Sequence, residues 1–213
     1  MKKLNLYILP LLALAFILTA CNKDDNPKPT PNPGGSTYFI TAAVVSGASY
    51  NDRVDSVYAI LPMSGKEDII LAGVEYKDGG FSMNLLDTIP DSYLKDIIDL
   101  YVFDKATISD STAKATVEPV RFLAYKGGQA VGEFVHSGDR GDGVLENAKY
   151  LYADKPVEIF ASKGIYDKEI HRYNVVYRRG WNIGRSFYMK ENGIDVYEYE
   201  MNNLFGLSWH FTR

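Results

Sequence analysis

The sequence predicts an all-β protein, an antiparallel β-sandwich arranged as two consecutive sandwich units. Short apolar segments recur about every 10 residues with glycine or asparagine turns between them, which is typical of sandwiches and barrels. The chain has 16 Tyr and 10 Phe, and aromatic residues favour strands. No segment of about three helical turns has the apolar periodicity of an amphipathic helix.

The chain divides into four segments on composition. They are a signal peptide at 1–20, a lipidated cysteine with a proline-rich tether at 21–36, a first sandwich at 37–105 and a second at 106–213. The boundary between the sandwiches is expected in the polar stretch from Asp104 to Thr116, so that Trp181 and Trp209 share a core with later residues only. A single sandwich of ten or more strands is the alternative, because each half is small for a core without disulfides.

The first 20 residues have the pattern of a secretory signal peptide. Lys2 and Lys3 precede an apolar run from Leu4 to about Ile17, which is short for a membrane-spanning helix of about 20 residues. The run ends in Leu18-Thr19-Ala20-Cys21, which resembles the bacterial lipobox. Cys21 is the only cysteine in the chain, so no internal disulfide can form. The resemblance implies that Cys21 is lipidated.

The segment after Cys21 is expected to be a spacer. It contains an acidic pair at Asp24-Asp25, four alternate prolines from Pro27 to Pro33, and Gly34-Gly35-Ser36. Alternate prolines favour an extended polyproline II conformation with a rise of about 3.1 Å per residue. The acidic cluster resembles the tether of Bacteroidota lipoproteins that face the cell exterior, so we expect an outer-membrane location with the domain outside.

The first half contains five expected strands. They are Tyr38–Val45, Val54–Leu61, Ile69–Tyr76, Phe81–Leu85 and Ile97–Phe103. Alternation places Ile40, Ala42 and Val44 on one face of the first strand. Lys77-Asp78-Gly79-Gly80 is a hairpin signal, and a short helical turn is expected after Pro90.

The second half repeats this style. The expected strands are Val117–Tyr125, Ala130–His136, Lys149–Tyr152, Val157–Ala161, Ile170–Arg178, Ile183–Met189 and Asp195–Glu200. Pro119 places the first of them at a sheet edge or a bulge, and Ser137–Gly143 is expected to be a loop. Phe205, Leu207, Trp209 and Phe211 are expected to form an inward-facing row at the end of the chain.

Several short segments resemble known surface proteins. Phe39 to Leu86 resembles the carboxypeptidase-regulatory, transthyretin-like β-sandwich modules, on the residues Ile40–Val44, Asp55–Ala59 and Gly79–Met83. Tyr150–Asp154, Gly180–Asn182 and Leu207–Trp209 resemble segments of uncharacterised Bacteroidota surface lipoproteins. The resemblance implies a non-catalytic surface protein with a transthyretin-like sandwich at 37–105.

The candidate ligand site is aromatic. Asp195, Tyr197 and Tyr199 share one face of a strand, and Tyr173 and Tyr177 share one face of an earlier strand that could lie beside it. Aromatic rings with neighbouring carboxylates can bind sugars, because the rings offer apolar surface and the acids accept hydrogen bonds from hydroxyl groups. The alternative is that these tyrosines fill the core and place their hydroxyls at its rim.

No catalytic residue, metal site or cofactor is predicted. His136 lies near Asp139 and Asp142 without the order of a calcium-binding loop, and His171 has no second histidine at ligand spacing. His210 is expected to be an exposed strand residue, and Arg140-Gly141-Asp142 is best explained as a turn. There is no Gly-x-Ser-x-Gly or phosphate-binding glycine loop.

These observations predict a non-catalytic lipoprotein attached to the outer membrane by its lipid. It would be a binding or structural module, with glycan binding and adhesion to another surface protein both open. A surface hydrolase acting on polysaccharide or peptide is the alternative. The formal net charge is −4 at pH 7, and an acidic chain without a basic stripe argues against a nucleic-acid partner.

Overall fold

The computed structural model describes residues 38–63, 65–100, 106–139, 144–165, 169–201 and 204–213. The predicted signal peptide, Cys21, the predicted tether and Arg140-Gly141-Asp142 lie outside these residues. Among the described residues, no helix has the length and apolar character needed to cross a bilayer.

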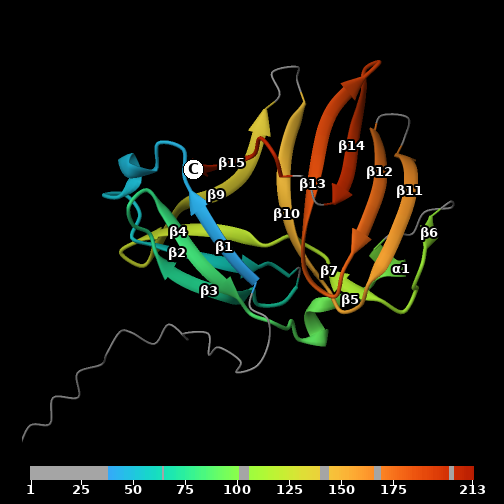
Figure 1. Cartoon of the computed structure of the whole chain (residues 1–213), viewed down its shortest axis with the longest axis horizontal. Helices are drawn as coiled ribbons and strands as arrows, with labels where there is room; N and C mark the ends of the chain where they lie inside the picture. Colours follow the sequence, from blue (N-terminus) through green and yellow to red (C-terminus); the bar gives the residue numbers. More distant parts are fainter. Residues whose placement is uncertain (1–37, 64, 101–105, 140–143, 166–168, 202–203) are drawn as a thin grey trace, which may run out of the picture.

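The all-β prediction is confirmed: nearly all regular structure is strand (Figure 1). The strands are β1 (Tyr38–Ala43), β2 (Ser56–Leu61), β3 (Ile69–Glu75), β4 (Gly80–Leu85), β5 (Leu94–Asp96), β6 (Thr107–Ile108), β7 (Lys114–Thr116), β8 (Arg121–Lys126), β9 (Gln129–Asp139), β10 (Leu145–Ala153), β11 (Val157–Ile165), β12 (Glu169–Tyr177), β13 (Gly180–Glu191), β14 (Ile194–Met201) and β15 (Ser208–Thr212). The helical elements are two 3-10 turns, Gly47–Tyr50 and Asp91–Tyr93, and the single-turn α1 (Ile97–Leu100).

The strands form one large curled sheet and one small sheet. The main path of the large sheet runs β3-β2-β8-β9-β10-β13-β14-β12-β11-β6. β15 pairs with β9, and β7 pairs with both β5 and β10. β1 and β4 pair with each other and lie over the half of the large sheet that contains β2, β3 and β8 (Figure 1).

The turn between β3 and β4 sends the chain from the large sheet to the small one. The expected hairpin turn forms, with Asp78 at φ 54° and Gly79 at φ 78° and paired hydrogen bonds between Lys77 and Gly80. The ladder ends at that pair, because β4 goes on to pair with β1 while β3 pairs with β2. The backbone at Gly47 passes close to this turn. A Cβ on Gly47 would lie 2.1 Å from the Gly79 carbonyl oxygen, so position 47 requires glycine.

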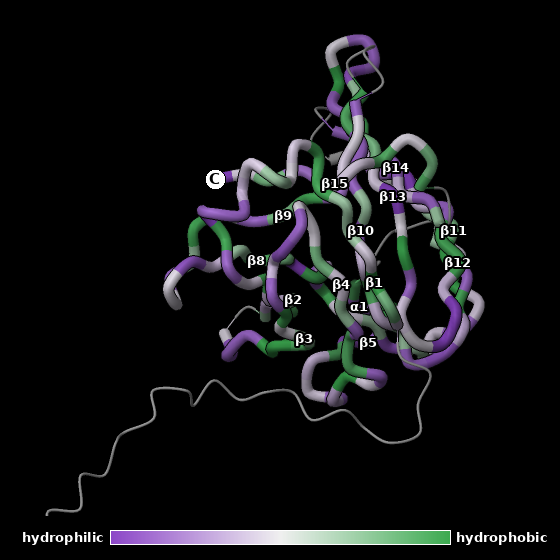
Figure 2. The backbone as a smooth tube through the Cα atoms, turned by 60° about the vertical axis from the view of Figure 1, so that its left-hand side comes forward, coloured by the Kyte–Doolittle hydropathy of each residue, from purple (hydrophilic) through white to green (hydrophobic). Residues whose placement is uncertain are grey.

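The first core lies between the two sheets. Alternation correctly placed Ile40, Ala42 and Val44 on one buried face at β1, and Phe81, Met83 and Leu85 of β4 are buried opposite them. Figure 2 shows hydrophobic residues, in green, along β1 and β4 where they lie against the large sheet. The same core includes Phe122, Phe134 and Trp209 from the second half of the chain.

The predicted boundary between two consecutive units is therefore wrong. β2 pairs with β8 across Asp104–Thr116, and the Trp209 ring meets Phe81 with centroids 5.3 Å apart. The indole nitrogen of Trp181 donates a hydrogen bond of 2.7 Å to the Leu86 carbonyl. Both tryptophans therefore contact the first half of the chain.

A second, smaller core lies on the other face of the large sheet. It contains Ile97 of α1, Ala115 of β7, and residues of β11 and β12 such as Ile159 and Val175. β10 separates the two cores, because Tyr150 and Tyr152 belong to the first while Ala153 and Leu151 belong to the second. Successive residues of a strand point to opposite faces, so the covered face of the sheet changes at β10.

Four local predictions are also corrected. Ile97–Leu100 is the start of a predicted strand but forms α1. The expected loop Asp104–Thr116 contains β6 and β7, and β9 continues to Asp139 into the expected loop at Ser137–Gly143. Phe205 does not face inward but is 90% exposed. The helical turn after Pro90 is confirmed as the 3-10 turn Asp91–Tyr93.

Candidate functional site

The candidate tyrosines lie on the face of the large sheet that carries the second core. β12 and β14 are parallel neighbours, and their register pairs Tyr173 with Tyr199 and His171 with Tyr197. Residues in register on adjacent strands point to the same face, so the two predicted groups lie side by side. The possibility that the earlier strand lies beside Asp195–Glu200 is thus realised in the fold.

The aromatic side chains form a stacked row. The Tyr173 and Tyr199 rings are nearly parallel, at 5°, with centroids 4.5 Å apart. His171 stacks on Tyr197 at 4.8 Å, and Tyr197 lies 5.3 Å from Tyr188 of β13. Because each ring covers its neighbour's face, the row presents ring edges and hydroxyl groups to a ligand, not the flat platform expected from sequence.

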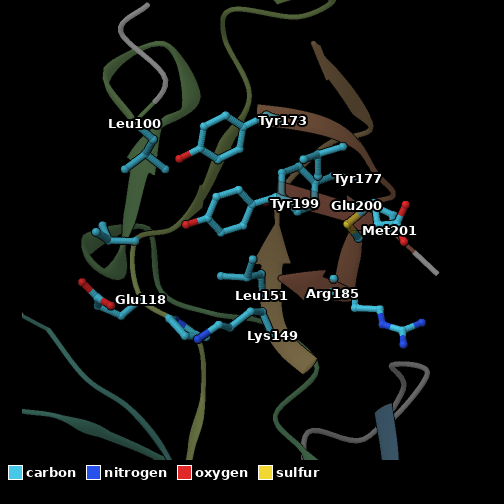
Figure 3. A pocket seen from close by; sticks show the side chains of 14 residues that line it. Leu100, Glu118, Lys149, Leu151, Tyr173, Tyr177, Arg185, Tyr199, Glu200 and Met201 are labelled. Atoms are coloured by element: carbon cyan, nitrogen blue, oxygen red, sulfur yellow. The ribbon is translucent and has the colours of Figure 1, made fainter. Parts of the chain in front are cut away.

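The end of the row at Tyr173 and Tyr199 borders a pocket of about 370 Å³, which we call the tyrosine pocket. Its sheet wall comes from β10, β13, β14 and β12 and includes Lys149, Leu151, Gly184, Tyr173, Val175, Tyr177, Tyr199 and Met201. Its other wall is Leu100 of α1 and residues 117–119. Figure 3 shows both tyrosine hydroxyls directed toward the side where Leu100 and Glu118 lie.

One basic side chain lies on the sheet wall of the tyrosine pocket. Lys149 is half-buried, and burial lowers the pKa of its ammonium group. The charges of Glu118 and Glu133 act in the opposite direction. Arg185 also borders the pocket, but its guanidinium lies on the opposite face of β13, where it forms a buried ion pair with Glu146; Figure 3 shows it directed away.

The Tyr199 hydroxyl remains protonated at neutral pH, because its pKa lies above the usual value for tyrosine. Burial raises the pKa of Tyr199, and a hydrogen bond with Tyr173 opposes that shift without cancelling it. A protonated phenol both donates and accepts hydrogen bonds. The pocket therefore offers the hydroxyls of Tyr173 and Tyr199, the Lys149 ammonium and several apolar side chains.

At the other end of the row, polar interactions hold the side chains of Tyr188 and His171 in place. The Tyr188 hydroxyl donates a hydrogen bond of 2.8 Å to Asp195, and the Lys190 ammonium lies 3.6 Å from the same carboxylate. His171 Nε2 lies 3.7 Å from Glu169 Oε1. Asp195 is thus engaged on this face away from the tyrosine pocket, whose lining it does not join.

The five predicted site residues are therefore split by the fold. Tyr173, Tyr177 and Tyr199 line the tyrosine pocket, with Tyr177 almost fully buried in the second core. Tyr197 and Asp195 lie farther along the same face. The sequence reasoning missed Lys149 and Leu151, although the strand Lys149–Tyr152 was predicted and alternation places these two residues on one face, opposite Tyr150 and Tyr152.

The histidines do not assemble a hydrolytic or metal site among the described residues. No group of three or more potential metal ligands is found there. His136 stacks on Trp209 at 4.8 Å, its Nδ1 lies 3.0 Å from the Tyr150 hydroxyl, and burial lowers its pKa. His210, which was expected to be exposed, is half-buried. The distance of 3.7 Å between Glu169 Oε1 and His171 Nε2 is longer than the roughly 2.6–3.2 Å of an oriented catalytic pair.

Comparison with known proteins gives no relative on which to base a function. No protein-family model matches the chain, no curated protein matches it, and no solved structure matches it. The function is therefore inferred from the residues of the tyrosine pocket and from the amino-terminal sequence.

Proposed function

We propose that this protein is a non-catalytic lipoprotein of the outer membrane whose tyrosine pocket binds a sugar unit of a glycan on the cell exterior. The observation that carries the proposal is the stacked pair of Tyr173 and Tyr199, whose hydroxyls share a pocket with apolar side chains. Sugars combine hydroxyl groups with apolar ring surface, and such a wall complements both.

The size of the pocket supports a small ligand. Its volume of about 370 Å³ is at the lower end of the roughly 300–1,000 Å³ typical of ligand sites. Leu100 and Leu151 supply apolar contact on its two walls. A single sugar ring fits this description better than a protein partner, which requires a larger and flatter surface.

The arrangement of acids favours binding over hydrolysis. Two carboxylates on either side of the bond are the usual machinery of glycoside hydrolysis. Of the two acids that border the pocket, Glu118 belongs to the outer wall, whereas the side chain of Glu200 belongs to the opposite face of β14, beside Arg185 in register. A surface hydrolase is the second candidate, favoured only by the Glu169–His171 pair at 3.7 Å.

Removing the tyrosine pair is expected to weaken glycan binding strongly. We predict that Tyr173→Ala with Tyr199→Ala weakens binding on a glycan array at least about tenfold, because both hydroxyls and one wall of the pocket are lost. The measurement uses residues 37–213, which include every described residue, and bound glycan is also checked for cleavage.

The matched control is a second cross-strand tyrosine pair on the same sheet. Tyr58 and Tyr125 lie with ring centroids 5.1 Å apart on β2 and β8 and are half-buried like the pocket pair. Tyr58→Ala with Tyr125→Ala should leave the array signal unchanged. The proposed site would be refuted if the unaltered domain bound no glycan on the array, or if the two double variants lost equal binding. Cleavage of a bound glycan would favour the hydrolase.

The amino-terminal part of the proposal has its own test. Substitution Cys21→Ala should abolish incorporation of a labelled fatty acid in a bacterium that processes lipoproteins, because the acyl chains attach at that residue. The protein should then move from the membrane to the soluble fraction, since acyl chains provide the attachment. Unchanged labelling, or membrane retention in the absence of labelling, would contradict lipid anchoring through Cys21.

A further inference from the structure

We propose that the sugar taken by the tyrosine pocket carries a carboxylate, as in a uronic acid, and that Lys149 binds this group. This inference rests on the proposed function, and it adds the charge of the ligand and the residue that recognises it. It is carried by the position of Lys149 on the same wall as Tyr173 and Tyr199.

Lys149 is the cation that the described lining presents to a ligand. It lies on β10 beside Leu151, facing the pocket, while the guanidinium of Arg185 is engaged by Glu146 on the other face. Glu118 and Glu133 act on the ammonium through their charge. Within the described part of the chain no hydrogen bond engages the ammonium, and its three donors can bind a ligand.

The electrostatic cost at Lys149 favours an anion. A half-buried ammonium loses part of its hydration, and a carboxylate that enters the pocket compensates for that loss. Glu133 is already paired with Arg121, with 2.7 Å between Oε2 and Nη2. Glu118 is exposed on the outer wall, where solvent screens its repulsion of an incoming anion.

The remaining groups fit a polar ring that carries such a carboxylate. The rings of Tyr173 and Tyr199 are stacked and their hydroxyls hydrogen-bond each other, so the pair presents phenol groups, which donate and accept hydrogen bonds, to the hydroxyl groups of a sugar. Leu100 and Leu151 contact the carbon skeleton of a ring placed between the walls. A bare inorganic anion would leave these apolar and phenolic groups unused.

The test compares acidic and neutral sugars of the same ring size. The full chain, purified in detergent, is titrated calorimetrically with glucuronate and galacturonate and with glucose and galactose. We expect at least one uronate to bind about tenfold or more tightly than its neutral counterpart, and Lys149→Met to remove that preference. Lys149→Arg, which keeps the charge, should retain most of it.

Two further variants sharpen the result. Glu118→Gln should strengthen uronate binding about two- to threefold without affecting neutral sugars. Lys126→Met, which removes an exposed charge at the far end of β8, should change neither. Equal affinities for acidic and neutral sugars, or a preference that persists in Lys149→Met, would overturn the role of Lys149.

The outcome also separates this inference from the proposed function. Neutral sugars that bind as well as uronates, and whose binding is lost in the Tyr173 and Tyr199 double variant, would overturn the inference and leave the sugar site in place. If neither uronate binds while the array shows another glycan, the acidic ligand is excluded. No binding on the array, together with no binding in the titrations, would overturn both the proposed function and the role of Lys149.

Discussion

Substitution Trp209→Ala is expected to destabilise the whole protein by about 3–5 kcal/mol, the usual cost of removing a buried aromatic side chain. The indole is 5% exposed and meets Phe81 from the small sheet and Phe122 from the large sheet, at 5.3 and 4.9 Å between ring centroids. Chemical denaturation followed by circular dichroism should show a single transition moved to lower denaturant, with no separate transition for either half.

The matched control lies four residues earlier. Phe205 is 90% exposed, so Phe205→Ala should change the free energy of unfolding by no more than about 0.5 kcal/mol. Two resolved transitions in the unaltered protein, or a Trp209→Ala transition confined to part of the signal, would show that the halves fold independently. That result would contradict a core shared between them.

The second large effect is expected at the buried ion pair between β10 and β13. Glu146 and Arg185 are 2% and 5% exposed, and the guanidinium donates a hydrogen bond to the Glu146 carboxylate. Arg185→Met leaves the carboxylate buried without its main counter-charge, which typically costs about 3–5 kcal/mol. Chemical denaturation at neutral pH measures this loss.

Removing both charges should restore much of that stability. Arg185→Met combined with Glu146→Leu replaces the pair by apolar side chains, which is often neutral or stabilising. The surface pair Arg121–Glu133 provides the control, because Arg121→Met at an exposed site should cost at most about 1 kcal/mol. A double variant as unstable as the single Arg185→Met variant would show that the ion pair is not the source of the loss.

The strands and their buried faces could be predicted from the sequence because alternation has a period of two. Phe81, Met83 and Leu85 illustrate this, since the polar residues Ser82 and Asn84 between them leave one choice of inner face. Ile97-Ile98-Asp99-Leu100 lacks that alternation, and its apolar run was interpreted as a strand. The structure makes it α1, where Ile97 donates a backbone hydrogen bond to Ala113 and Ile98 is 50% exposed.

The pairing of strands from both halves of the chain in one large sheet could not be predicted from the sequence. Tyr150-Leu151-Tyr152-Ala153 is apolar on both faces, as expected for a strand between two cores, but nothing local says which core each face joins. The pairing of β2 with β8 joins residues more than 60 positions apart, and no local turn specifies it. Tertiary contacts decide such pairings, and a boundary drawn at a polar stretch misses them.

Only part of the candidate site could be predicted, because alternation groups residues within one strand but does not say which strands are neighbours. Alternation grouped Tyr173 with Tyr177 and Tyr197 with Tyr199, and the structure adds the parallel register that joins the groups. Lys149 comes from a strand separated from β14 by β13, so only the sheet order brings it to the pocket. The orientation of the rings also depends on that register, since adjacent tyrosines on parallel strands stack on one another.

The most direct test of the tyrosine pocket is nuclear magnetic resonance of the soluble domain with labelled tyrosine and lysine, titrated with a glycan that binds on the array. The proposed site predicts that the ring signals of Tyr173 and Tyr199 and the side-chain signals of Lys149 shift together and saturate at one ligand concentration. The signals of Tyr58 and Tyr125 should stay in place. Shifts at Tyr58 and Tyr125 with Tyr173 and Tyr199 unmoved would contradict the site and place binding elsewhere on the sheet.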